Sequence, residues 1–198
     1  MFDSGITAFE IIEQIKKEAD IAVQIPDESY MIWLNAVEQL LYTEVIKEQG
    51  VVTKENTGEA IILADIDVPD GENAVRFEDI HAVYANGVQL IRSTAASGVI
   101  FPNTYYKCGD KLCVNASEGA DIKIVYFVKP EIKTVDNYEE AHVMLPSEFV
   151  DLVKAKLRAE AYKVANEGDV AAMWMNDYNA LLETFKAWIG SKSPQFGV

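Results

Sequence analysis

The sequence predicts an α+β protein: a four-helix unit formed from the N- and C-terminal segments, with an inserted antiparallel β-sandwich or barrel domain. Helical periodicity in residues 1–50, short β-type runs in residues 51–137 and renewed helical periodicity in residues 138–198 predict this organisation. None of the four helical stripes can be buried alone, so the two ends of the chain are expected to pack together. The last residues of the third range are expected to form a flexible tail.

Two helices are predicted before residue 51. The stretch "TAFE", Thr7 to Glu10, is a capping box, and Pro26-Asp27 marks a break before a second helix, which Gly50 is expected to end. The first apolar stripe contains Ile6, Phe9, Ile12, Ile15 and Ala19, and the second contains Tyr30, Trp33, Leu34, Val37, Leu41 and Val45.

The middle of the chain reads as at least five short strands joined by tight turns. Asn86-Gly87 in "HAVYANGVQLIR" is a strong hairpin signal, and Cys108-Gly109-Asp110 joins the runs "NTYYK" and "KLCVN". The runs "EAIILADIDV" and "DIKIVYFVKP" are rich in β-branched and aromatic residues. In the first of these, the alternating apolar positions are Ile62, Ala64, Ile66 and Val68.

Helical periodicity returns at "VMLPSEFVDLVKAKLRAEAYKVANEGD". Pro146 suits the first turn of a helix, Gly168 is expected to close that helix, and Asp169 is expected to cap the next one. The expected buried face of the third helix is Phe149, Leu152, Val153, Leu157, Ala161 and Val164, and that of the fourth is Ala171, Met175, Tyr178, Leu182, Phe185 and Ile189.

Composition and charge exclude several classes of protein. The chain has 198 residues and a formal net charge of −15, which disfavours binding to DNA or to an anionic membrane. No apolar run is long enough to span a bilayer, and the N-terminus lacks the basic start of a secretory signal, so an intracellular setting is expected. Cys108 and Cys113 flank a Gly-Asp turn, so they could lie near one another across a hairpin. In an intracellular setting they are expected to be reduced strand residues, without zinc-site spacing.

No catalytic, metal or cofactor site is expected. His81 and His142 lack a nucleophile or second ligand at recognisable spacing, and the glycines match no phosphate-binding motif. The acids Asp65, Asp67 and Asp70 resemble the start of a calcium loop, but the fifth, sixth and twelfth positions hold Pro69, Asp70 and Arg76.

The tryptophans lie on predicted helices and are expected in the core or at an interface. Trp33 and Trp188 have apolar neighbours in sequence, whereas Trp174 lies beside the Met175 stripe, which leaves it free for a neighbouring chain. Trp174 is therefore a candidate interface residue.

The order of elements over nearly the whole chain resembles that of bacteriophage head-to-tail adaptor (connector) proteins, including the tail tubular protein of short-tailed phages. The resemblance is carried by "YMIWLNAVEQLLYTEVI", "HAVYANGVQL", "GDKLCVNASEGADIKIVYFVKPEI" and "MLPSEFVDLVKAKLRAEAYKVANEGDVAAMWMNDYNALLETF". It implies a non-enzymatic virion protein, assembled in the bacterial host cytoplasm, that binds beneath the portal protein and joins the capsid vertex to tail or neck proteins.

The resemblance also implies an oligomer and a role for each part of the chain. Subunits would form a ring of about twelve copies with DNA passing through it without specific binding, and could stay monomeric in isolation. The helical part would dock on the portal, with Trp174, Lys192 and Phe196 as candidate portal or subunit contacts, and the Asn86-Gly87 hairpin would face the tail. The resemblance also implies a C-terminal tail that threads into the portal, and "GSKSPQFGV", which contains Lys192 and Phe196, has this character. A disordered end is the alternative reading of this stretch.

A second hypothesis is a ligand-binding module, such as a carbohydrate-binding β-domain on a helical stalk. Tyr105 and Tyr106 could stack on sugars, but adjacent strand residues point to opposite faces and do not form one platform.

Overall fold

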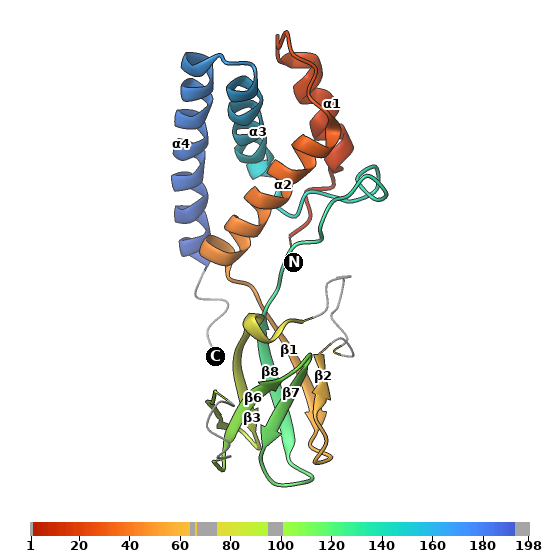
Figure 1. Ribbon diagram of the computed structural model, residues 1–198. Helices are drawn as coiled ribbons and strands as arrows, with labels where there is room; N and C mark the ends of the chain where they lie inside the picture. Colours follow the sequence, from red (N-terminus) through yellow and green to blue (C-terminus); the bar gives the residue numbers. More distant parts are fainter. Residues whose placement is uncertain (1, 64–65, 67–74, 95–100, 193–198) are drawn as a thin grey trace. The chain divides into compact units, whose positions relative to one another are not determined.

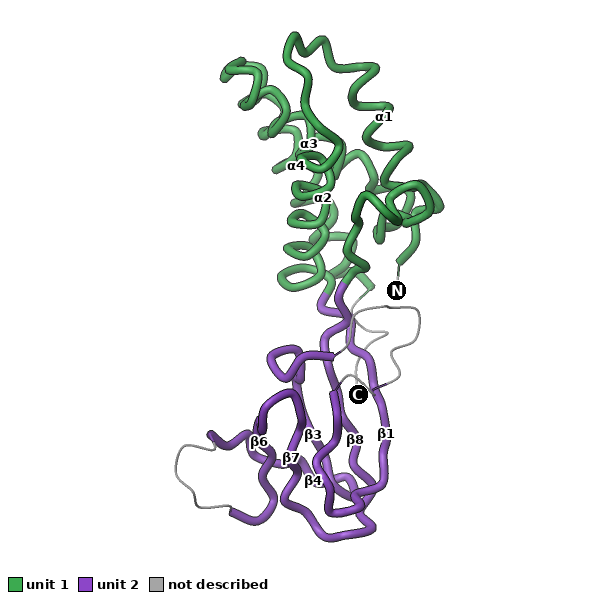
Figure 2. Tube along the Cα trace, turned by 45° about the vertical axis from the view of Figure 1, so that its right-hand side comes forward, with its two compact units in different colours: residues 1–46, 130–198 green, residues 47–129 purple. Residues whose placement is uncertain are grey.

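The chain divides into two compact units. The structure is a computed structural model that describes residues 2–63, 66, 75–94 and 101–192 (Figure 1). One unit comprises residues 1–46 and 130–198, and the other comprises residues 47–129 (Figure 2). The described residues form a mixed α+β fold with four α-helices in the first unit and two four-stranded sheets in the second.

Helix α1, Ala8–Glu18, begins at the predicted capping box. The Thr7 side chain accepts a hydrogen bond from the Glu10 amide at 3.2 Å, and the Glu10 carboxylate accepts one from the Thr7 amide at 2.9 Å. The buried face consists of Ala8, Ile11, Ile12 and Ile15. Phe9 was predicted in this face but is exposed, and its ring meets the edge of Tyr138 at 5.7 Å. The observed buried face therefore contains Ala8 and Ile11, which were not predicted, and lacks Phe9.

Helix α2, Asp27–Leu41, ends earlier than predicted. It continues as a π-helix, Tyr42–Ile46, and Lys47 then adopts a left-handed conformation with φ 51°. Gly50, the predicted helix stop, lies instead in strand β1, Gln49–Glu55. The prediction was wrong because glycine also serves where a large side chain lies over the backbone, and here that side chain is Tyr126.

Helix α3, Val150–Val164, follows a short 3-10 turn, Ser147–Phe149, that begins after Pro146. Asn166, in the left-handed region at φ 61°, ends it, with the Glu167 amide donating to the Tyr162 carbonyl at 2.9 Å. This is a Schellman cap, in which Asn replaces the commoner Gly. Gly168 was predicted to close α3, but it is the first residue of α4, Gly168–Lys192.

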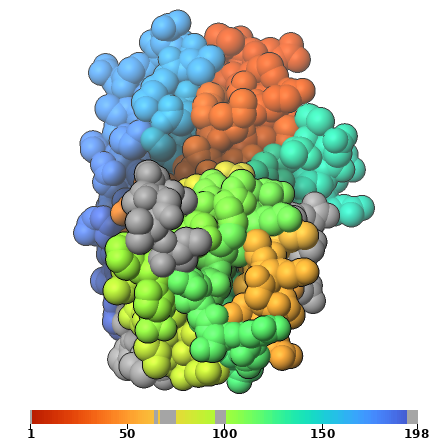
Figure 3. All heavy atoms as spheres, turned by 60° about the horizontal axis from the view of Figure 1, so that its bottom comes forward, coloured from red at the N-terminus to blue at the C-terminus, as the bar shows by residue number. Residues whose placement is uncertain are grey.

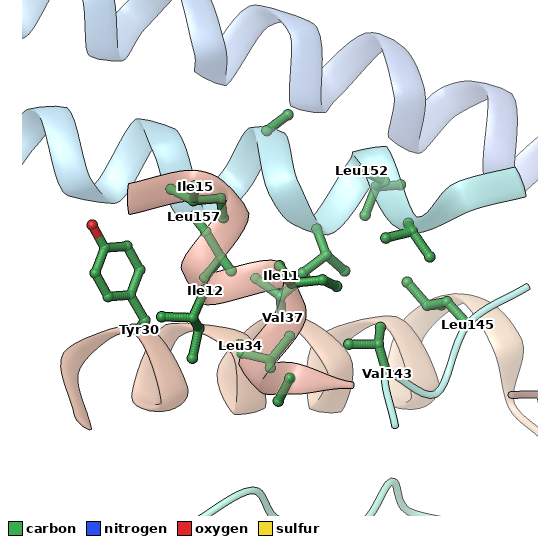
Figure 4. Close-up of a cluster of buried hydrophobic side chains, with 14 of the residues drawn as sticks. Ile11, Ile12, Ile15, Tyr30, Leu34, Val37, Val143, Leu145, Leu152 and Leu157 are labelled. Carbon is green, nitrogen blue, oxygen red and sulfur yellow. The ribbon is translucent and has the colours of Figure 1, made fainter. Parts of the chain in front are cut away.

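The four helices share one hydrophobic core, and α3 buries more residues than the predicted stripe contains. Val164, predicted to be buried, lies exposed in the last turn of α3, whereas Val150, Ala155 and Ala159 are buried without having been predicted. Figure 4 shows residues from α1, α2 and α3 directed into this core, together with two from the segment that precedes α3. The labelled set is Ile11, Ile12, Ile15, Tyr30, Leu34, Val37, Val143, Leu145, Leu152 and Leu157. The last two helices therefore pack with the first two in a common core.

Helix α4 completes this core with one row of side chains. Ala171, Tyr178 and Phe185 are buried, and the remaining predicted positions Met175, Leu182 and Ile189 are partly buried. Phe185 contacts Phe149 of the 3-10 turn, with ring centroids 4.8 Å apart.

The first sheet of the second unit has the order β1-β8-β3-β4 and is antiparallel throughout. Its strands are β1, β8 (Asp121–Phe127), β3 (Ile80–Ala85) and β4 (Val88–Gln89). The second sheet has the order β2-β7-β6-β5, with strands β2 (Ile61–Ile62), β7 (Lys111–Asn115), β6 (Thr104–Cys108) and β5 (Ile91–Arg92). Strands β5 and β6 are parallel, which corrects the expectation of a wholly antiparallel domain.

Both sheets contribute to one core in this unit. Tyr105 and Leu112 of the second sheet cluster with Val83, Ile122 and Ile124 of the first. Leu90 lies between β4 and β5, at the point where the chain passes from one sheet to the other, and it is buried. The predicted strand around "EAIILADIDV" is limited to β2 in the described residues, and Ala64 and Val68 lie outside them.

Replacing Gly50 by alanine is expected to destabilise the second unit by about 1–3 kcal/mol, because a Cβ at this position would overlap the ring of its cross-strand partner Tyr126. Chemical denaturation would measure the loss. Gly190→Ala in α4 is the matched control, since a Cβ there meets open space and alanine favours helix. Equal stability of the Gly50→Ala protein and wild type would contradict the close approach.

Candidate protein interface

Trp174 lies on α4 at a shallow groove between α1, α3 and α4, with a volume of about 500 Å³. The Arg158 guanidinium lies over the indole ring, 4.6 Å from its centroid, and also forms an ion pair with Glu18 of α1. Trp174 is thus half-buried and already contacts a cation of its own chain. The indole surface that remains for a contact with another protein is therefore smaller than that of a fully exposed tryptophan.

Lys192, at the end of α4, has its ammonium group 5.0 Å from the centroid of the Trp188 ring. Trp188 also contacts Phe149, Phe185 and Phe2, so Lys192 lies at the border of an aromatic cluster. Phe196 lies outside the described residues.

The Asn86-Gly87 hairpin has the backbone of a type I′ turn. The φ angles are 49° and 81°, and both residues of such a turn require positive φ. The Asn86 side-chain oxygen accepts a hydrogen bond from the Asp121 amide at 2.9 Å, which ties the turn to the start of β8. The candidate residues therefore fall into two sets, with Trp174 and Lys192 in the helical unit and the hairpin in the β-unit.

Cys108 and Cys113 form a disulfide, which corrects the expectation that they are reduced. They lie on the paired strands β6 and β7, on either side of the Gly109-Asp110 turn, with Cα atoms 6.2 Å apart. This separation is within the range that a disulfide spans. The sequence position of the pair predicted its proximity, whereas the assumed redox setting predicted the wrong chemical state.

The two histidines lie in separate settings, His142 beside a carboxylate and His81 beside an aromatic ring. His142 contacts the Asp3 carboxylate at 3.0 Å, and the pKa of Asp3 is lowered by a hydrogen bond from the Gly5 amide and by His142. The His81 ring lies 5.0 Å from that of Phe127. Within the described ranges, no three His, Cys, Asp or Glu residues are grouped as metal ligands, and the acids Asp65, Asp67 and Asp70 lie outside them.

A buried ion pair in the helical unit was missed by sequence reasoning. The Lys133 ammonium lies 2.5 Å from the Glu38 carboxylate, and both side chains are fully buried. Glu38 also accepts a hydrogen bond from the Met144 amide at 2.7 Å, and burial raises its pKa despite these opposing interactions. The sequence contained one signal of this burial: Glu38 follows Leu34 by four residues, so the two side chains lie on the same, buried face of α2.

The tyrosines of the ligand-binding hypothesis do not form a joint surface. Tyr105 is buried, and its ring packs against Phe77 with centroids 6.0 Å apart. Tyr106 is half-buried and adjacent to it on β6, so the two side chains point to opposite faces. Nothing in this pair favours a sugar-stacking platform.

Among helices in the described part of the chain, none has the length and apolar character required to cross a bilayer. Comparison with known proteins finds no family model and no curated protein that matches the chain.

Proposed function

We propose that this protein is a non-enzymatic structural protein of a phage or prophage, a head-to-tail adaptor that docks beneath the portal as a ring and joins the capsid vertex to the tail. The observation that carries the proposal is the division into two units with separate hydrophobic cores, which agrees with the architecture that the sequence resemblance implies. Two units with separate cores can each present a surface to a different neighbour, which suits a protein that joins two others.

In this proposal the β-unit is a sandwich inserted into the helical bundle. The helical unit faces the portal, with Trp174 and Lys192 near the contact, and the Asn86-Gly87 hairpin faces the tail or neck proteins. The type I′ turn, which the Asn86 side chain ties to β8, suits the hairpin to a protein contact made with little change of backbone.

The acidic composition is compatible with a ring around DNA. A channel that conducts a duplex should not hold phosphates tightly, and a formal charge of −15 disfavours such binding. The protein would be assembled in the host cytoplasm and retained in the virion.

The proposal is tested by mixing the purified protein with the portal protein encoded in the same phage genome and measuring particle masses. We expect a mass increase corresponding to a closed ring on the portal, of about twelve copies as the resemblance implies, and monomers when the portal is absent. Absence of portal-dependent assembly, together with binding to a glycan array, would instead favour the ligand-binding module.

A further inference from the structure

The outer face of α2 carries large apolar side chains that the four-helix core does not use. Ile32 is 65% exposed and Leu40 is 49% exposed, and Ala36 lies exposed between them. These three residues are spaced by four and therefore form one ridge along the helix, opposite the buried Leu34 and Leu41.

Residues 130–142, which follow the β-unit and which we name the return segment, lie alongside α2 and are hydrogen-bonded to it. The Asn35 side chain donates to the Lys133 carbonyl at 2.8 Å and accepts from the Lys133 amide at 2.9 Å. Farther along, the Tyr138 hydroxyl donates to the Asp27 carboxylate at 3.3 Å. Figure 3 shows atoms of this return segment, in teal, next to those of the N-terminal helical segment, in orange-red.

The return segment adds two exposed apolar side chains, Ile132 and Val135. Together with the ridge they form a surface that we name the α2 face, which consists of Ile32, Ala36, Leu40, Ile132 and Val135.

The charges that α2 and the return segment themselves bring to the surface are of one sign. Lys16 of α1 reaches Asp27 at the start of α2 and is paired there. Residues 21–46 contain no Lys or Arg, and Lys133 is the only one in residues 130–153. Both segments are described throughout, and the Lys133 ammonium is fully buried against Glu38, so neither segment brings a lysine or arginine to the surface. The exposed carboxylates of residues 21–46 and 130–142 are Glu28, Glu44, Asp136, Glu139 and Glu140.

We propose that the α2 face is a docking surface for an amphipathic, Lys- or Arg-bearing segment of another protein. Apolar side chains of that segment would cover Ile32 and Leu40 while its cations met the surrounding carboxylates, which is the charge complementarity that specific interfaces use. A second copy docked through the same face would bring carboxylates against carboxylates, and nucleic acid or anionic lipid would also be repelled. The assignment of this partner to the portal or neck rests on the proposed function.

The first experiment uses the full chain with labelled Ile, Leu, Val and Met methyl groups and two designed helical peptides as probes. One peptide combines leucine with lysine, and the other has each lysine replaced by glutamate. The lysine peptide is expected to shift the methyl signals of Ile32, Leu40, Ile132 and Val135, with an affinity that falls as salt is added. Equal binding of both peptides, or shifts confined to other residues, would overturn the inference.

The second experiment uses variants. Ile32→Glu combined with Leu40→Glu should raise the Kd for the lysine peptide at least about tenfold, because central apolar contacts dominate such interfaces. Val164→Glu combined with Met173→Glu is the matched control, since these side chains are 47% and 51% exposed and lie away from the α2 face. An equal loss of binding in both double variants would contradict the assignment.

Portal assembly separates this inference from the proposed function. If wild type assembles on the portal and the Ile32→Glu, Leu40→Glu variant does so equally well, the docking surface is wrong and the adaptor function stands. If the peptide maps to the α2 face but wild type does not assemble on any portal, the docking surface stands and the adaptor function is wrong.

Discussion

Replacing Lys133 by methionine is expected to lower the free energy of unfolding by about 3–5 kcal/mol, because the Glu38 carboxylate would remain buried without its cation. The Met144 amide would then be the remaining hydrogen-bond donor that the structure shows for this carboxylate. Urea denaturation of the wild type and the variant measures the difference.

The loss caused by Lys133→Met should depend on pH. Burial raises the pKa of Glu38, and removing Lys133 removes an interaction that opposes this rise. The folded state then takes up a proton at Glu38 more readily than the unfolded state does. The variant should therefore be closest to wild type in acid and lose stability as the pH rises through the raised pKa of the folded state.

Two controls identify the pair as the cause. Changing both partners, Glu38→Leu with Lys133→Met, removes both buried charges and should recover much of the loss. Lys17→Met removes an exposed lysine from α1 and should have little effect. A Lys133→Met protein as stable as Lys17→Met would show that the ammonium is not buried against Glu38.

Replacing Phe185 by alanine is expected to destabilise the helical unit by about 3–5 kcal/mol, since it removes a fully buried ring and leaves a cavity. The ring contacts both Phe149 and Trp188, with ring centroids 4.8 Å and 6.2 Å away, so both contacts would be lost together. Thermal or urea unfolding followed by tryptophan fluorescence would report the change.

Met173→Ala, an exposed position on the same helix, is the control for Phe185→Ala and should stay within about 0.5 kcal/mol of wild type. The reverse order of stability for these two variants would contradict the orientation of α4. Leu182 belongs to the same predicted stripe but is only partly buried, so its truncation should cost less than that of Phe185.

Local features of the fold were readable from the sequence because their causes lie within a few residues. The Thr7–Glu10 capping box and the Asn86-Gly87 turn follow directly from residue type and spacing. The end of α3 was predicted at Gly168 because glycine commonly closes helices. Asn166 closes it instead, since asparagine can also adopt the left-handed conformation. The parallel pairing of β5 with β6 depends on contacts between distant segments, which no local pattern specifies.

The candidate sites were predictable only in part, for related reasons. Glu38 and Lys133 are 95 residues apart, so neither position could indicate the other, although the place of Glu38 on an apolar stripe marked it as unusual. The position of Trp174 on its helix could be read, but its contact with Arg158 required the packing of α3 against α4. Ile32 and Leu40 were left outside the predicted stripe of α2 and are exposed, whereas the course of the return segment along α2, which carries Val135, depends on contacts between distant residues.

The shared helical core has a consequence for synthesis on the ribosome. Residues 47–129 are continuous, so the β-unit can close as soon as they emerge, whereas the core of the other unit joins residues such as Ile11 and Leu157 from either side of it. Nascent α1 and α2 must therefore wait, with their apolar faces uncovered, until the whole β-unit and α3 have left the exit tunnel. During that interval the half-made chain is the species most exposed to aggregation and most dependent on chaperones.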